Sequence, residues 1–273
     1  MLKFSANLGM MFGEEEDPIK RMELAKTSGF GAVEYLFVYD MSLEILKSES
    51  SRLGLGWSVV NIALGEGIKN GPLVAATPGK EESWKENVAA AIEYCDVLRP
   101  ATAVIPAFSP PESVSREDAM EVFKPSLIYA AEEFHKIGIK LSIEPLNPKI
   151  RANALLTTSA ETLDLIEELG HSNLGIEFDV FHLYATEGNI DANIKKCLPN
   201  VGNIQIADIP DRNEPGTGEV DFESFFKVLE DCNYQNWVAA EYIPSSNTLA
   251  SLNWMKITSL TNTIDRPTTL RNI

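Results

Sequence analysis

Four oxygen-bearing side chains stand at or near the ends of four successive apolar segments in the second half of the chain. They are Glu144, Asp179, Gln205 and Glu241, which follow LSI, IEF, NI and VAA respectively. They are separated by 35, 26 and 36 residues. Each separation is close to the length of one strand, one helix and their connecting loops. The spacing therefore predicts a repeated βα unit that presents one such side chain each time.

Three carboxylates confined to one small volume repel one another and raise one another's pKa. A divalent cation would remove that repulsion. Carboxylate and amide oxygens are hard ligands, and they favour Mg²⁺ or Mn²⁺, with Co²⁺ also compatible, over a zinc site built from thiolates. The sequence therefore predicts a divalent metal site with four ligands: Glu144, Asp179, Gln205 and Glu241.

Taken singly, each of these residues also has an ordinary structural role. A carboxylate at a strand end is often a helix N-cap, and a buried amide often only satisfies backbone groups. His182 could be a loop histidine, and Arg212 could pair at the surface with Asp211 or Glu214. The metal interpretation therefore depends on the four residues occurring together at successive strand ends.

Short β-like segments alternate with amphipathic helical segments along the chain. Strands are predicted at 3–8, 31–37, 54–62, 102–108, 139–145, 174–179, 201–208 and 237–242. Helices are predicted at 18–26, 42–53, 81–98, 115–137, 159–169, 189–198, 221–232 and 246–260, with a long loop over 64–79. This alternation predicts parallel strands joined by crossover helices. Eight units in 273 residues favour an α/β fold of the (β/α)8 TIM barrel type, with residues 1–273 as a single domain.

In such a barrel, functional side chains lie at the C-terminal ends of the strands, which converge on one mouth. The four predicted ligands are therefore expected to point at the same small volume. Asn7 and Glu34 also lie near predicted strand ends, but the sequence assigns them no role.

Composition and charge exclude several other classes of protein. The chain carries 40 acidic and 23 basic residues, a net charge of −17, whereas nucleic-acid-binding proteins normally present a basic surface. We therefore expect no nucleic-acid partner. No apolar stretch reaches the roughly 18 residues that span a membrane, and residues 1–17 lack a signal-peptide pattern, so no membrane association and a cytoplasmic location are expected.

The three cysteines are far apart in the sequence. Cys95, Cys197 and Cys232 form no Cys-x-x-Cys pair. This spacing argues against a disulfide framework or a zinc knuckle and indicates buried or half-buried thiols in a reducing compartment.

Six further segments can be compared with known families: FSANLGMMF, GFGAVEYLF, LSIEPLNP, IEFDVFH, IQIADIPDRNEPGTGEVDF and AAEY. Together they resemble the hydroxypyruvate isomerase family, one of the xylose-isomerase-like TIM barrels. The resemblance covers nearly the whole chain. It implies a (β/α)8 fold, a divalent metal, and interconversion of hydroxypyruvate with tartronate semialdehyde by proton transfer through an enediolate.

The same resemblance implies roles for particular residues. The metal ligands of the family correspond here to Glu144, Asp179, Gln205 and Glu241. The proton-transferring pair corresponds to Glu144 and Glu241. His182 and Arg212 match positions that contact the substrate in related epimerases. A guanidinium offers a bidentate fork, so Arg212 is expected to hold a substrate carboxylate.

Other functions stay open on the sequence alone. The segment IPAFSPPES departs from the Met-Ala-Gly turn of the family, and the loop over 64–79 is only partly similar. The four ligands equally suit an isomerase of a longer 2-oxo acid, such as a 2-oxo-tetronate, or a sugar 3-epimerase. A metal-dependent AP endonuclease would need a DNA-binding face and more than three histidines. A non-catalytic sugar-binding barrel would not need two spare carboxylates. The small-molecule substrate could be bound by a monomer or by a homo-oligomer.

Overall fold

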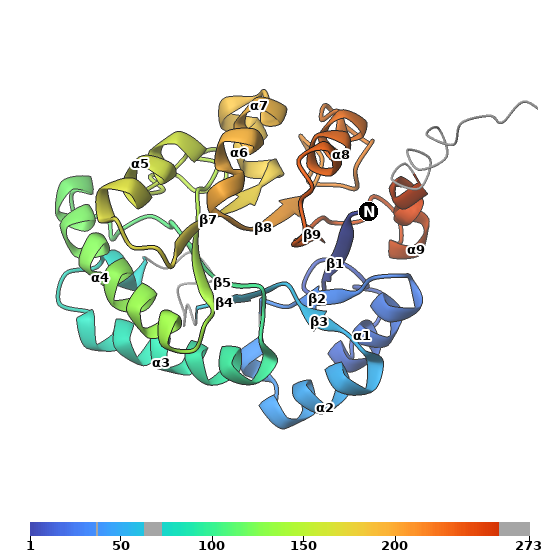
Figure 1. The fold of residues 1–273 in the computed structure, drawn as a ribbon, viewed down its shortest axis with the longest axis horizontal. Helices are drawn as coiled ribbons and strands as arrows, with labels where there is room; N and C mark the ends of the chain where they lie inside the picture. The colour runs from blue at the N-terminus through green and yellow to red at the C-terminus, as the bar shows by residue number, and fades with distance from the viewer. Residues whose placement is uncertain (37, 63–72, 257–273) are drawn as a thin grey trace, which may run out of the picture.

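Nine strands form one sheet in the computed structural model, which describes residues 1–36, 38–62 and 73–256. All of their pairings are parallel. The strands surround the centre of the molecule and the helices lie outside them (Figure 1). In pairing order, the strands are β3 (Gly56–Trp57), β2 (Ala32–Glu34), β1 (Lys3–Asn7), β9 (Trp237–Ala240), β8 (Val201–Ile206), β7 (Leu174–Asp179), β6 (Lys140–Glu144), β5 (Thr102–Pro106) and β4 (Val59–Asn61).

Ser58 closes the ring of strands. It separates β3, which pairs with β2, from β4, which pairs with β5. The backbone N–H of Ser58 donates to the Val33 carbonyl at 3.0 Å, and the Ser58 carbonyl accepts from the Thr102 N–H at 3.3 Å. β3 and β4 are therefore two parts of one barrel strand. The predicted (β/α)8 TIM barrel is confirmed, and the strand predicted over 54–62 is interrupted at Ser58.

Helices follow the strands and cover the outside of the barrel. They are α1 (Pro18–Thr27), α2 (Leu43–Leu53), α3 (Glu81–Leu98), α4 (Arg116–Lys136), α5 (Ser159–Leu169), α6 (Val180–Glu187), α7 (Ile190–Cys197), α8 (Phe222–Asp231) and α9 (Thr248–Ser251). The main hydrophobic core lies between these helices and the strands, and it includes large buried side chains such as Phe123 of α4 and Phe226 of α8.

Alternation along β7 places acidic side chains inside the barrel. Phe178 packs outward against Phe225 of α8, with ring centroids 6.3 Å apart. Because successive side chains of a strand point to opposite faces, Glu177 and Asp179 point inward. Glu177 accepts a hydrogen bond of 2.6 Å from Nδ2 of Asn203 on β8. Asp179 is the last residue of the strand, so its carboxylate lies at the mouth of the barrel.

Helix α6 was not predicted from the sequence. It begins directly after β7 because Oδ1 of Asp179 accepts a hydrogen bond of 2.8 Å from the Phe181 N–H, which is the N-cap interaction. His182 therefore lies in the first turn of a helix rather than in a loop. The N-cap role uses only one carboxylate oxygen of Asp179, and the other remains available to the mouth of the barrel.

The C-terminal element also differs from its prediction. The helix predicted over 246–260 is replaced by α9 and a 3₁₀ turn, Leu252–Trp254, and its last residues lie outside the described part of the chain. Most of the loop predicted over 64–79 also lies outside it, apart from residues 73–79, which include a 3₁₀ turn at Val74–Ala76.

All three thiols are free, and two of them are buried as predicted. Cys95 and Cys197 are buried, whereas Cys232 is exposed, which corrects the prediction that all three are at least half-buried. Cys232 directly follows α8, where the chain turns through solvent toward β9. Among the described helices, none has the length and apolar character needed to cross a bilayer.

Candidate functional site

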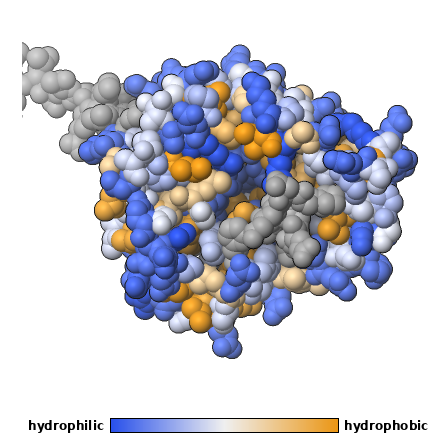
Figure 2. All heavy atoms as spheres, turned by 180° about the vertical axis from the view of Figure 1, so that it is seen from behind, coloured by the Kyte–Doolittle hydropathy of each residue, from blue (hydrophilic) through white to orange (hydrophobic). Residues whose placement is uncertain are grey.

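The three predicted carboxylates come together around two other side chains, His182 and Arg212. Nε2 of His182 lies 3.7 Å from Oε1 of Glu144 and 3.5 Å from Oδ2 of Asp179. Nη2 of Arg212 lies 3.4 Å from Oδ2 of Asp179 and 2.6 Å from Oε2 of Glu241. The side chains of the three carboxylates are at most 14% exposed. Figure 2 shows a hydrophilic hollow near the centre of one face of the molecule, as expected for the open end of a barrel with these strand ends.

Burial makes the ionised forms of these carboxylates unfavourable. The pKa of Glu144 is raised well above its usual value, first by burial and then by the charges of Glu241 and Asp179. Burial raises the pKa of Glu241 to about 7 and also raises that of Asp179, in both cases against the opposing charge of Arg212. A cation placed among these groups would favour their charged forms. The electrostatics of the site therefore suit a bound cation.

The tautomer of His182 decides what this histidine can offer. Glu144, Asp179 and His182 form a buried group whose candidate ligand atoms lie within 4.8 Å of one another, and such a group could hold a metal. However, Nδ1 of His182 accepts a hydrogen bond of 3.2 Å from the Asn147 N–H. Burial, followed by the charges of Arg212 and Arg151, lowers the pKa of His182 well below its usual value. The neutral ring therefore carries its proton on Nε2, which makes it a hydrogen-bond donor and not a metal ligand.

Gln205 supplies an oxygen that fits a cation. Its Nε2 donates to Oε1 of Glu34 at 3.0 Å. Its Oε1 is buried and has no hydrogen-bond partner in the described part of the chain. A buried carbonyl oxygen without a partner is costly, and a hard divalent cation is a suitable partner for it. On this observation and on the chemistry of the donors, the residues present fit a divalent metal.

Asn7 and Glu34 belong to the same cluster, although the sequence assigned them no role. They are register partners at the ends of β1 and β2. Nδ2 of Asn7 donates to Oε1 of Glu34 at 2.9 Å and to Oε1 of Glu241 at 3.0 Å. Glu34 is 2% exposed. The only sequence signal for these residues was their position at the ends of the first two strands.

Arg212 is presented to the site by the segment 207–220. Oδ2 of the buried Asp208 accepts hydrogen bonds from the N–H groups of Gly216 and Gly218 at 2.9 and 2.8 Å. Its Oδ1 accepts from the Val220 N–H at 3.0 Å. The carbonyl of Arg212 accepts from the N–H of Ile243, just beyond β9, at 2.9 Å. These bonds fix the course of the segment, and so the place of the guanidinium.

The guanidinium of Arg212 faces the barrel mouth and not the surface. It lies over the ring of Phe181, 4.9 Å from the ring centroid. Its Nη2 pairs with Asp179 and Glu241, so the alternative of a surface pair with Asp211 or Glu214 is wrong. Its Nε is buried and has no hydrogen-bond partner among residues 1–36, 38–62 and 73–256. One donor of the guanidinium is therefore not satisfied by the described protein groups.

Gly218 allows the tight course of this segment, and its substitution is a test of it. A Cβ at position 218 would lie 1.8 Å from the Ile209 carbonyl oxygen, so the backbone must shift to accept it. We expect Gly218→Ala to lower the free energy of unfolding by more than about 2 kcal/mol and to lower activity by displacing Arg212. Urea denaturation followed by tryptophan fluorescence measures the first effect. Gly13→Ala is the matched control, because a Cβ at that position meets nothing within 4 Å; equal stability losses in both variants would contradict the prediction.

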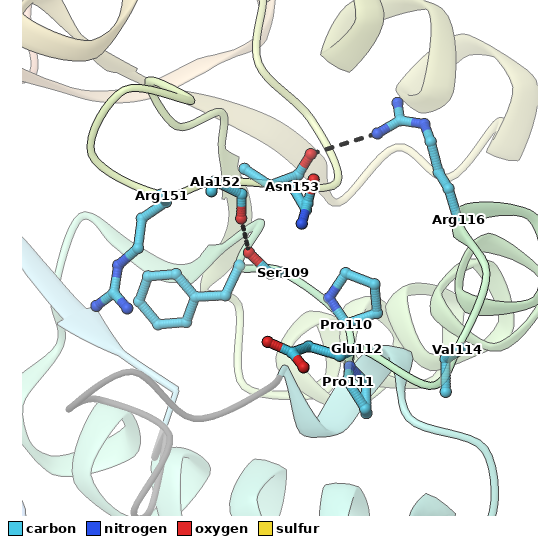
Figure 3. A pocket seen from close by; sticks show the side chains of 11 residues that line it. Ser109, Pro110, Pro111, Glu112, Val114, Arg116, Arg151, Ala152 and Asn153 are labelled. Atoms are coloured by element: carbon cyan, nitrogen blue, oxygen red, sulfur yellow. Dashed lines mark hydrogen bonds between the residues drawn. The ribbon is translucent and has the colours of Figure 1, made fainter.

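A pocket of about 540 Å³ lies between segments 108–116 and 151–154. In Figure 3, the Ser109 hydroxyl donates to the Ala152 carbonyl, and Arg116, the first residue of α4, donates to the Ala154 carbonyl. The guanidinium of Arg151 lies over the ring of Phe108, 4.4 Å from its centroid. None of the four predicted metal ligands is among the residues that line this pocket. The segment IPAFSPPES, which departs from the family pattern, therefore contributes to a pocket whose lining also includes Arg151, a residue whose charge, after burial and the charge of Arg212, lowers the pKa of His182.

Comparisons with known proteins give consistent results. The sequence model of the family described as Xylose isomerase-like TIM barrel matches residues 22–258. The chain is 37% identical over 255 residues to hydroxypyruvate isomerase of Escherichia coli, covering 93% of this chain and 98% of the relative. It is 32% identical over 256 residues to 2-oxo-tetronate isomerase of Haemophilus influenzae, with 94% and 99% covered. A crystal structure of AP endonuclease, family 2, from Brucella melitensis matches with a TM-score of 0.88 at 30% identity and covers 94% of this chain and 98% of its own.

Proposed function

Because this chain belongs to the xylose isomerase-like TIM barrel family and is an isomerase, we propose that it interconverts hydroxypyruvate and tartronate semialdehyde with the help of a divalent metal. One observation carries the proposal. At the mouth of the barrel, three carboxylates that are at most 14% exposed meet a guanidinium side chain that is 19% exposed and an amide oxygen that has no hydrogen-bond partner among the described residues. A metal and a small carboxylic acid are the ligands that such a set of groups binds together.

The proposed metal ligands are Glu144, Asp179, Gln205 and Glu241. Mg²⁺ or Mn²⁺, with Co²⁺ as an alternative, would polarise the oxygens of the substrate and so acidify the neighbouring C–H bond. The neutral Nε2–H of His182 stays a donor beside these ligands. It is positioned to hydrogen-bond to a substrate oxygen, because it lies within 3.7 Å of both Glu144 and Asp179.

Glu144 and Glu241 are the proposed proton carriers. One glutamate removes a proton from C3, the hydroxymethyl carbon of hydroxypyruvate, and leaves an enediolate. The other glutamate delivers a proton to C2, while the hydroxyl proton moves from O3 to O2, which gives tartronate semialdehyde without any net change in atoms or electrons. Burial raises both pKa values when no cation is bound. A bound metal would favour the ionised form that a base needs.

Arg212 is the proposed partner of the substrate carboxylate. Its Nε has no partner in the described structure, and a guanidinium can offer two parallel donors to a carboxylate. This arrangement supports an acid substrate over a free sugar, which carries no carboxylate.

The test is turnover of hydroxypyruvate by the purified full-length protein after EDTA treatment and again after Mn²⁺ or Mg²⁺ is restored. We expect activity to be lost with EDTA and recovered with metal. A second candidate, a longer 2-oxo acid, is favoured by the similarity to a 2-oxo-tetronate isomerase, so 2-oxo-tetronate is assayed in parallel. Preference for that substrate would change the substrate assignment, and metal-independent turnover would contradict the mechanism.

DNA cleavage, which the name of the Brucella structure raises, is disfavoured by the net charge of −17.

A further inference from the structure

Glu34 is a buried carboxylate that the proposed mechanism does not use. Its Oε1 accepts hydrogen bonds from Nδ2 of Asn7 at 2.9 Å and from Nε2 of Gln205 at 3.0 Å. Its Oε2 accepts from Oγ of Ser58 at 3.0 Å. It borders a cavity of about 10 Å³ that it shares with Gln205 and Glu241. That volume suits about one water molecule, and both carboxylate oxygens of Glu34 already accept hydrogen bonds from protein groups. Any effect of Glu34 on the site therefore passes through its neighbours.

Asn7 has a fixed orientation. Its Oδ1 accepts hydrogen bonds from the N–H groups of Gly9 at 2.9 Å and Met10 at 3.2 Å. Its Nδ2 must then face the carboxylates of Glu34 and Glu241, as observed. Rotating the amide by 180° would place its oxygen against two carboxylates and its NH₂ against two N–H donors. Asn7 therefore links the positions of Glu34 and Glu241 to the backbone after β1.

Gln205 depends on Glu34 for its orientation. Glu34 takes the Nε2 end of the amide, and the Oε1 end is left buried without a partner within the described residues. Removing the acceptor at position 34 would let the amide rotate. The NH₂ group would then occupy the place of the oxygen, and it has no lone pair to offer a cation.

We propose that Glu34 is a positioning residue. Together with Asn7, it selects the oxygen of Gln205 as a metal ligand and holds Glu241 in place. This inference rests on the proposed metal site. Groups that orient metal ligands in this way typically change metal affinity by about 10–100-fold when they are removed.

The experiment measures the dissociation constant of Mn²⁺ by titration calorimetry, using the full-length protein after EDTA treatment and dialysis. We expect Glu34→Ala to weaken Mn²⁺ binding by about 10–100-fold. We expect Glu34→Gln to bind within a few fold of the unsubstituted protein, because its amide oxygen can still accept from Gln205 and Asn7 while its NH₂ donates to Ser58. If Glu34 acted only through its negative charge, both variants would lose affinity alike.

Glu177→Ala is the matched control. Glu177 is also a buried barrel glutamate bonded to an amide, that of Asn203, but no hydrogen bond joins it to a proposed ligand in the described structure. Its Mn²⁺ affinity should stay within a few fold of the unsubstituted protein. Thermal unfolding of each variant without metal shows whether it is folded.

A second pair of variants keeps the inference testable if Glu34→Ala is unstable. Gln205→Glu has an oxygen at both ends of the side chain, so it needs no amide orientation. In that background Glu34→Ala should cause a smaller loss of Mn²⁺ affinity than it causes in the unsubstituted protein. An equal loss in both backgrounds would overturn the positioning role. If the unsubstituted protein binds Mn²⁺ and Glu34→Ala binds it equally well, only this inference is wrong. If the unsubstituted protein binds no Mn²⁺, the proposed metal-dependent function falls as well.

Discussion

Replacing either Glu144 or Glu241 with glutamine should lower kcat for hydroxypyruvate isomerisation by about 10²–10⁴-fold. Glutamine has the shape of a protonated glutamate and keeps one oxygen for a metal, but it cannot accept and return a proton. Because the pKa of each glutamate is raised by burial, the neutral amide should not disturb the fold. Assays at saturating Mn²⁺ separate the loss of proton transfer from a loss of metal affinity.

Deuterium exchange can assign each glutamate to one carbon. In D₂O, the glutamate that acts at C3 should exchange the C3 protons of hydroxypyruvate even when transfer to C2 is blocked. We therefore expect one of the two glutamine variants to retain exchange at C3 while forming no tartronate semialdehyde, and the other to lose both reactions. Proton NMR of the substrate measures the exchange. Glu177→Gln is the control for a buried glutamate away from the mouth and should isomerise normally; full turnover in both Glu144→Gln and Glu241→Gln would show that neither carries the proton.

The barrel and the proposed metal ligands could be predicted because both depend on patterns within short segments of the sequence. Alternating segments specify strands and crossover helices, and a polar residue that ends an apolar strand is visible wherever it occurs. Asp179 illustrates the limit of this reasoning. Its position after an apolar strand predicts either a helix N-cap or a metal ligand, whereas in the structure its Oδ1 caps α6 and its Oδ2 faces the mouth. A pattern of residue types does not distinguish the two oxygens of one carboxylate.

Contacts between side chains on non-neighbouring strands could not be predicted, because no local sequence pattern specifies them. Gln205 of β8 reaches Glu34 of β2, although β1 and β9 lie between these strands in the sheet. The contact depends on strand register and on the barrel closing, which a single sequence does not specify. Arg212 was ambiguous for a similar reason. Its inward position depends on Asp208 collecting three N–H groups from Gly216, Gly218 and Val220, and those bonds exist only once the segment has folded.

Removing the metal should make the stability of the protein fall as the pH rises from about 4.5 to above 7. The pKa values of Glu34 and Glu241 are raised from 4.5 to about 7, and that of Glu144 is raised well above 4.5, in each case chiefly by burial. The folded state therefore binds more protons than the unfolded state in this range, and the free energy of unfolding falls with pH. One group whose pKa moves from 4.5 to about 7 contributes a loss of roughly 3 kcal/mol.

His182 and the carboxylates with lowered pKa values limit the pH range in which this fall in stability should appear. The pKa of His182 is lowered, so this residue raises stability as the pH climbs toward its unfolded pKa of about 6.5. The carboxylates with raised pKa values outnumber it, so stability should still fall, and the decline should steepen as the opposing effect of His182 fades toward that pH. Carboxylates whose pKa is lowered, such as Glu14, Glu81 and Glu161, lose their contribution only as the pH falls below about 4.5.

The measurement is urea denaturation between pH 5 and pH 8, in EDTA and in excess Mn²⁺. Bound Mn²⁺ would hold its carboxylate ligands in their ionised forms in the folded state, so the decline should be much shallower with metal, and the stabilisation by Mn²⁺ should grow with pH. Glu241→Gln removes one of the responsible groups and should flatten the curve in EDTA. Stability that is constant or rises from pH 5 to pH 8 in EDTA would show that these buried carboxylates are already ionised in the folded protein without a metal.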